Sequence, residues 1–330
     1  MKKACSLLFL VFLSLLVKAQ ELYNLTLPAS TIPKGAMGVR LFDESYSEQG
    51  LIRKITVLKV MYGVTPKLTV TLSGVASDYH SLYLPVDFIL HDHSGGGAPP
   101  SANLPQSTPN PYIFAGGDLY AQYRFLSSDG QNTHFRMAAY GEGSYIRIAS
   151  HLGEPELLTH NTGFGAGIIS TYLKSHFAGT VTLGCVIPTE YQGNAFDKYG
   201  GVFPTAIKYG NAIDYNLALG YLLFPRHYKS YEQSNINLYL EFLGKSYGAA
   251  QVTQKDGVIT DHIPNTAFLK ADNYMDINPG IQWIIKSSLR IDVSVGFPLI
   301  NSSFLHEYPI YYIGLQRYFF FKKRISAKSD

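Results

Sequence analysis

The sequence predicts an all-β chain: a transmembrane antiparallel up-and-down β-barrel of about 12 strands, with short periplasmic turns and long outer loops. The first reason is alternation of apolar and polar residues over stretches of about ten residues, the length that a tilted strand needs to cross a membrane. The second is a regular alternation of short and long gaps between these stretches. The third is composition, because 25 Tyr, 19 Phe and 30 Gly with 15% charged residues are typical of a strand-rich, aromatic-banded protein.

The first 19 residues predict a secretory signal peptide. Lys2 and Lys3 precede an apolar run from Leu7 to Val17, and the small-residue cleavage site ends at Ala19. A retained membrane helix would need roughly 20 consecutive apolar residues, and Lys18 ends this run earlier. Export with cleavage after Ala19 is therefore expected.

Three further segments follow the signal peptide. Residues 20–34, which include Pro28 and Pro33, show no clear alternation and either plug the lumen or hang in the periplasm. Residues 35–321 contain the predicted barrel, and residues 322–330 form a basic C-terminal tail. The expected organisation is one barrel with a short extension at each end.

Net charge and cysteine content narrow the class of protein. Removal of the signal peptide takes away Lys2, Lys3 and Lys18 and no acid, so the 27 basic residues fall to the same number as the 24 acidic ones. A formally neutral chain lacks the positive surface that nucleic acid requires, so no nucleic-acid partner is expected. Cys185 is then the single remaining cysteine, and stability must come from burial or closure, not from an internal disulfide.

Period-two alternation defines the strands, most clearly at residues 212–223 and 289–299. A soluble sandwich also alternates, but its strands average five or six residues, so the longer stretches here favour a membrane barrel. Strands are expected near 35–44, 52–63, 67–77, 112–126, 133–149, 162–173, 176–187, 209–224, 235–246, 274–286, 288–299 and 309–321.

The connections between these strands alternate in length. The tight ones, expected on the periplasmic side, are 63–66, 127–132, 174–175 and 287. The connection 225–234 falls where a short turn belongs but is longer than the others. The long ones, expected on the outer side, are 45–51, 78–111, 150–161, 188–208, 247–273 and 300–308. Such an alternation is typical of outer-membrane barrels.

The predicted strands must close into a ring. In lipid every backbone N–H and C=O needs an internal partner, so the first strand is expected to pair with the last. The last strand ends in the aromatic cluster Tyr318-Phe319-Phe320-Phe321, which suits the interfacial girdle of a membrane barrel. An aromatic-ended final strand resembles the signal read by the assembly machinery for outer-membrane barrels. The expected location is the outer membrane of a Gram-negative bacterium, with outer-membrane lipid as a partner.

The polar face of each strand is expected to line the lumen. The lumen-facing candidates carry both charge signs, and they are Asp118, Gln122, Arg124, Arg136, Glu142, Asp214, Asn216, Glu241, Lys245, Arg290 and Asp292. They form either a polar pathway or binding site, or a ladder of salt bridges and hydrogen bonds that fills a narrow barrel. Size leaves both open, because a twelve-strand lumen lies between the filled eight-strand and the water-filled sixteen-strand barrels.

Motifs for metal, catalytic or cofactor chemistry are weak. His91-Asp92-His93 lacks the third and fourth ligands that zinc normally needs, so a solvated loop is expected there. His151 and His160 flank the third outer loop without a Gly-x-Ser-x-Gly serine motif, so no enzyme activity and no catalytic residue are predicted. The glycine run 163–167 lies inside a strand, where glycines allow close packing or bending. No metal and no cofactor are expected.

Two hairpins resemble a known family. Residues 60–70, with Tyr62-Gly63-Val64-Thr65 before a strand, resemble a hairpin of the outer-membrane proteins named for the meta-pathway of phenol degradation. Residues 278–283, followed by 295–299, resemble that family's penultimate hairpin. The resemblance covers the scaffold over most of the mature chain and implies a barrel akin to the long-chain fatty-acid transporters. It implies passage of small, often hydrophobic compounds and identifies no binding residue.

Two functions stay open. The lumen charges, the long outer loops and the family resemblance predict a transporter or channel for a small-molecule cargo of unknown identity. The alternative is a non-transporting surface scaffold or interaction barrel that acts through loops 78–111, 188–208 and 247–273. These loops carry aromatic residues suited to contact with a partner, among them Tyr191, Phe196, Tyr199 and Phe203.

Overall fold

The computed structural model describes most of the predicted barrel. The described residues are 22–48, 51–78, 112–147, 155–196, 202–225, 233–254, 270–303 and 307–321. The predicted signal peptide, the basic tail and the His91-Asp92-His93 motif lie outside these ranges. Among the described residues, no helix is long and apolar enough to cross a membrane.

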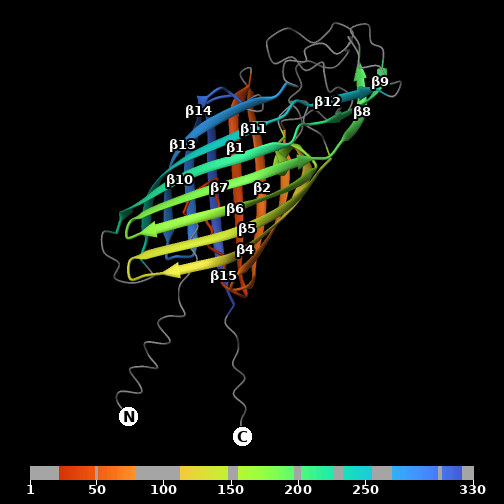
Figure 1. Cartoon of the computed structure of the whole chain (residues 1–330). Coiled ribbons are helices and arrows are strands. Elements are labelled where there is room, and N and C mark those ends of the chain that lie inside the picture. The colour runs from red at the N-terminus through yellow and green to blue at the C-terminus, as the bar shows by residue number, and fades with distance from the viewer. Residues whose placement is uncertain are drawn as a thin grey trace, which may run out of the picture.

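Twelve antiparallel strands of the described residues form a closed barrel, which confirms the predicted fold class (Figure 1). In chain order they are β1 (Ala36–Glu48), β2 (Leu51–Thr65), β3 (Leu68–Ser77), β4 (Ile113–Asp129), β5 (Thr133–Ile146), β6 (Gly163–Lys174), β7 (Phe177–Pro188), β10 (Ala212–Phe224), β11 (Asn235–Tyr247), β13 (Asp272–Ile285), β14 (Leu289–Ile300) and β15 (Ile310–Phe320). Strand β1 pairs with β15 from Ala36↔Phe320 to Ser45↔Tyr311. The first and last strands therefore close the wall, as predicted.

The outer surface of the barrel is apolar and its inner surface is polar. Along β15 the exposed side chains of Ile313 and Leu315 alternate with the buried Tyr312 and Gln316. Leu72, halfway along β3, is 62% exposed on the same outer surface. Exposed apolar side chains recur around the barrel in this way because successive residues of a strand point to opposite faces. An outward apolar band around a closed wall is the arrangement of a transmembrane barrel.

The short turns lie together at one end of the barrel, here called the short-turn end. They are 66–67, 130–132, 175–176 and 286–288. Ser175, Lys286 and Ser287 have φ values of 53°, 49° and 52°, the left-handed conformation that tight turns need. The connection between β10 and β11 covers 225–234, the longer gap that the sequence indicates.

One predicted outer loop is wrong. Residues 45–51 were expected to form a long connection, but β1 continues to Glu48 and β2 begins at Leu51, with Glu48 opposite Leu51 in the ladder. The reason is burial: Tyr46 packs in a cluster with Ile55 and Val57 inside the barrel. The two strands therefore stay paired as far as Glu48 and Leu51.

Two other predicted loops contain a small sheet. Strands β8 (Tyr191–Phe196), β9 (Val202–Lys208) and β12 (Gln251–Gln254) pair in the order β12-β9-β8 beyond the other end of the barrel, the loop end (Figure 1). The β9–β12 pairing joins two loops that are far apart in the sequence. At the same end, the loop between β5 and β6 contains a one-turn helix, α2 (Leu157–His160).

Candidate functional site

Residues 22–34 lie inside the barrel. The sequence leaves open a place in the lumen or in the periplasm for this segment, and the structure has it in the lumen. Several hydrogen bonds fix the segment at the short-turn end. Gln122 Nε2 donates to the carbonyl oxygen of Pro28 at 2.9 Å, and Arg136 Nη1 donates to Ser30 Oγ at 2.9 Å. The backbone N–H of Ile32 donates to Thr69 Oγ1, also at 2.9 Å. The segment therefore bonds to β3, β4 and β5, which are neighbours in the wall.

The deeper part of the segment is held by one buried carboxylate. Glu241 of β11 is fully buried and accepts the backbone N–H groups of Asn24, Leu25 and Thr26, at 3.3, 3.0 and 2.5 Å. The segment pairs with no strand of the described residues, so these N–H groups need side-chain acceptors. Glu241 supplies them, and a carboxylate makes a stronger acceptor than a neutral group.

Cationic side chains bond to the carbonyl groups of the same stretch. Arg40 Nη2 of β1 donates to the carbonyl oxygen of Asn24 at 2.6 Å, and Arg290 Nη2 of β14 donates to that of Tyr23. Asn24 Nδ2 in turn donates to Ser294 Oγ at 2.9 Å. The turn of the segment at residues 23–26 is thus bonded to three strands, β1, β11 and β14.

Apolar contacts also join the segment to the wall. Tyr23 packs against Ala218 and Tyr239, and Ala29 packs against Ala138. Burial raises the pKa of Tyr23 to about 12. Ile32 packs with Ala36 and Met61, so the segment is held by apolar contacts as well as by hydrogen bonds.

The close approach of the segment depends on a glycine in the wall. A Cβ atom at Gly63 of β2 would lie 2.2 Å from the carbonyl oxygen of Pro33. Gly63 was interpreted from the sequence as part of the turn before β3, but β2 continues to Thr65. Its role in the structure is to let the chain pass from the lumen into β1.

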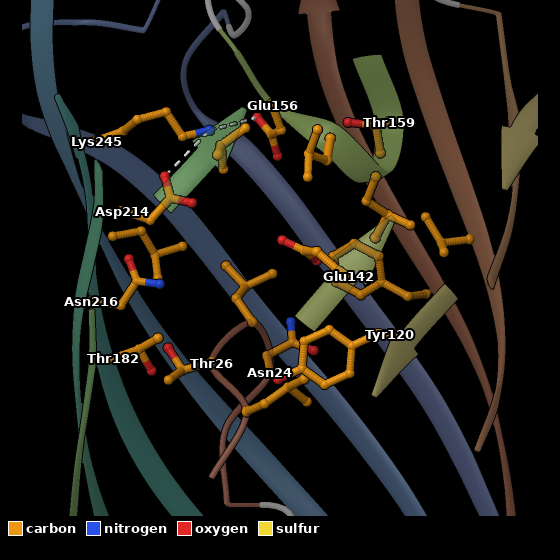
Figure 2. Close-up of a pocket in the computed structure, with 18 of the residues that line it drawn as sticks. Asn24, Thr26, Tyr120, Glu142, Glu156, Thr159, Thr182, Asp214, Asn216 and Lys245 are labelled. Carbon is orange, nitrogen blue, oxygen red and sulfur yellow. Dashed lines mark ion pairs between the residues drawn. The ribbon is translucent and has the colours of Figure 1, made fainter. Parts of the chain in front are cut away.

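A cavity of about 310 Å³ lies between the segment and the loop end (Figure 2). Residues 24–27 line it on one side, and residues 156–159, at the start of and within α2, line it on the opposite side. Strands on all sides of the barrel provide its wall. The lumen thus contains a chamber with a lining of its own, between two segments that do not belong to the barrel strands.

Carboxylates outnumber cationic groups in the lining of this chamber. The carboxylates are Glu44, Glu142, Glu156, Asp214 and Asp276, and the cations are Arg40, Lys59 and Lys245. Lys245 Nζ lies 3.8 Å from Asp214 Oδ1 and 3.9 Å from Glu156 Oε2, as the dashed lines in Figure 2 show. Lys245 thereby ties the loop before α2 to the wall.

The structure divides the predicted lumen residues into three groups. Glu142, Asp214, Asn216 and Lys245 line the chamber. Gln122, Arg136, Glu241 and Arg290 bond directly to residues 22–34.

The third group bonds within the wall or at its rim. Asp292 accepts a bond from Arg290 Nε at 2.6 Å, and Asp118 accepts one from Ser73 Oγ at 3.1 Å. Arg124 Nη2 donates to the carbonyl oxygen of Pro66 at 2.9 Å, at the short-turn end.

Sequence reasoning missed charged residues on β1, β2 and β13 and in the loop before α2, Glu44 of β1 among them. Arg40, Lys59, Asp276 and Glu156 all line the chamber but were not predicted. A signal for Lys59 was present, because it falls between the outward-facing Leu58 and Val60. Glu156 offered none, since it reaches the lumen from a loop.

The described part of the chain contains no group of three His, Cys, Asp or Glu side chains arranged to hold a metal ion. No protein-family model and no curated protein matches this sequence.

Solved barrels resemble the structure. An outer-membrane channel from Pseudomonas putida F1 aligns with a TM-score of 0.52 at 12% identity, covering 88% of this chain and 98% of that one. The NanC porin aligns with a TM-score of 0.40 at 8% identity, covering 85% and 98%. The Pseudomonas putida toluene transporter TodX aligns with a TM-score of 0.29 at 10% identity, covering 86% of each. The likeness to the Pseudomonas putida F1 channel is one of fold.

Proposed function

We propose that this chain is a channel through the outer membrane of a Gram-negative bacterium for small polar compounds, closed at its periplasmic end by residues 22–34. The observation that carries the proposal is a segment that lies inside the barrel without pairing with any described strand, next to a chamber that contains eight charged side chains among apolar and aromatic ones. The barrel strands pair with each other without this segment, so the segment can be displaced without loss of the barrel.

Several features support a membrane location and passage. The apolar outer band suits lipid, the predicted signal peptide suits export, and the fold is shared with a bacterial outer-membrane channel. The hairpins that resemble the family named for phenol degradation support passage of small compounds. The lining also contains apolar side chains, but its charged groups favour polar cargo over the hydrophobic compounds that this resemblance implies. An apolar solute would remove water from these carboxylates without replacing its hydrogen bonds.

The proposal is tested by weakening the segment without touching the wall. Glu241→Gln keeps the shape of the side chain but removes the charge that accepts three backbone N–H groups. A hydrogen bond to a charged group is worth about 1.5–3 kcal/mol. The fraction of time that the channel is open should therefore rise about tenfold or more. Single-channel recording in planar bilayers measures it directly.

Asp118→Asn is the matched control. It is the same chemical change on the inner wall, but Asp118 bonds to Ser73 and not to the segment. We expect its conductance to equal that of the unmodified chain. A heat-modifiable, folded barrel that neither conducts nor admits solutes into liposomes, in both the unmodified and Glu241→Gln forms, contradicts the proposal.

A surface-binding role is the second candidate. The small sheet β8-β9-β12 favours it, because paired strands give two outer loops a defined shape on a rigid frame. Replacing residues 191–208 with a short Gly-Ser linker should then abolish attachment to a partner while conductance is retained. Unchanged phenotype and partner binding after that replacement argue against this role.

A further inference from the structure

Glu142 presents a carboxylate to the chamber, and Lys59 and Lys245 attract it only from a distance. It lies on β5, and Figure 2 shows its side chain directed toward the interior of the chamber. Within the part of the chain that the structure describes, no hydrogen bond and no ion pair within 4 Å reaches this carboxylate. Nearby, Lys245 is already shared between Asp214 and Glu156. A partly buried charge of this kind is costly unless something pairs with it.

Two tyrosine rings lie beside this carboxylate. Tyr120 of β4 is opposite Glu142 in the ladder, and Tyr140 is two residues earlier on β5. Their rings are stacked, with centroids 5.2 Å apart and an interplanar angle of 22°. Both rings line the chamber. A carboxylate next to aromatic rings is the combination that recognises organic cations, which are attracted to the face of the ring as well as to the charge.

The glycines of the run 163–167 make room for this arrangement. A Cβ atom at Gly165 would lie 2.4 Å from Glu142 Oε1, and one at Gly167 would lie 2.6 Å from the Tyr140 ring. On the next strand, a Cβ atom at Gly184 would lie 2.1 Å from the Tyr140 hydroxyl oxygen. These glycines leave β6 and β7 without side chains at the positions where Glu142 and Tyr140 lie. The glycine run 163–167 therefore makes space for these two side chains.

We propose that the chamber binds a small organic cation, with its ammonium group between the Glu142 carboxylate and the Tyr120–Tyr140 ring pair. This inference rests on the proposed function and names the class of cargo. The volume of about 310 Å³ is at the lower end for ligand pockets, which limits the ligand to a few heavy atoms beyond the ammonium group. The excess of carboxylates in the lining disfavours an anion.

Binding is tested on the folded, detergent-solubilised full-length protein by isothermal titration calorimetry. The probe is tetramethylammonium chloride, and tert-butanol serves as a neutral compound of similar shape. We expect saturable binding of the cation, no binding of tert-butanol, and a loss of affinity of at least about tenfold in Glu142→Gln. Equal affinity of Glu142→Gln and the unmodified chain overturns the proposal, as does equal binding of tert-butanol or of potassium ions.

A second pair of variants guards against a folding defect. Gly165→Ala places a methyl group against Glu142 Oε1 and should weaken binding of tetramethylammonium at least about tenfold. Gly141→Ala, on β5, is its control, because the nearest atom to the new Cβ is 4.0 Å away. Equal affinities in the two variants contradict the assigned position. Calorimetry does not require the barrel to conduct. If the barrel binds tetramethylammonium but does not conduct, only the channel proposal fails. If it conducts but does not bind tetramethylammonium, only the proposal of a cation site fails.

Discussion

The carboxylate of Glu241 accepts a hydrogen bond at 2.5 Å from the backbone N–H of Thr26, a residue 215 positions earlier in the chain. Leu25 and Asn24 donate to the same carboxylate. One wall residue thus accepts three backbone N–H groups of the segment's deepest turn, and Arg40 and Arg290 bond to its carbonyl groups. This relationship makes the segment a separable part of the structure, because the barrel strands pair with each other without it.

Gly63→Ala should loosen the segment from its other end. The new Cβ would lie 2.2 Å from the carbonyl oxygen of Pro33, so the chain must move away from β2. We expect more frequent channel opening and faster proteolysis of the segment, with the barrel still heat-modifiable. Gly74→Ala on β3 is the control, since the nearest atom to its new Cβ is a Phe114 ring carbon at 3.5 Å. Identical behaviour of the two variants would count against the close packing at Pro33.

Arg290→Met should destabilise the barrel. It leaves Asp292, which is fully buried, without the guanidinium group 2.6 Å away. Loss of one partner of a buried ion pair costs about 3–5 kcal/mol of unfolding free energy, measured here by urea titration in lipid vesicles. The double variant Arg290→Met, Asp292→Leu should recover much of that loss. Arg317→Met, on the exposed face of β15, should change stability little. A single variant as stable as the unmodified chain contradicts this account of the pair.

Leu72→Arg should destabilise the barrel in lipid. Leu72 is exposed halfway along β3 and is opposite Val60 and Leu119, which are exposed too. An arginine on the lipid face near the bilayer midplane costs about 2–4 kcal/mol, and one near the interface about 0–1 kcal/mol. Val64→Arg, next to the end of β2, is therefore the matched comparison. Equal costs for both variants in vesicles would mean that this face does not meet the lipid core.

Much of the fold could be predicted from the sequence because alternation is a local property. Ile313 and Leu315 face outward and Gln316 inward on β15 by the same two-residue period that identifies the strand. The small sheet could not be predicted, since β12 has only four residues and pairs with a strand from another loop, Gln251 opposite Lys208. Short pairings between distant loops leave no periodic signal.

The candidate site could be predicted only in part for a related reason. Alternation indicated that Glu142, Asp214 and Lys245 share the polar face of their strands, and the chamber is lined by all three. It could not indicate that Lys245 meets Glu156, because that contact depends on how a loop folds into the lumen. The partners of Glu241 were equally hidden, since they are backbone groups of a segment without alternation.

The most direct test of the central claim is the single-channel conductance of a chain that lacks residues 22–32, compared with the complete chain. The deletion leaves every barrel strand intact, because β1 begins at Ala36. The account predicts a heat-modifiable barrel with a larger and steadier conductance than the complete chain. A folded barrel whose conductance equals that of the complete chain would contradict the claim that this segment closes the lumen.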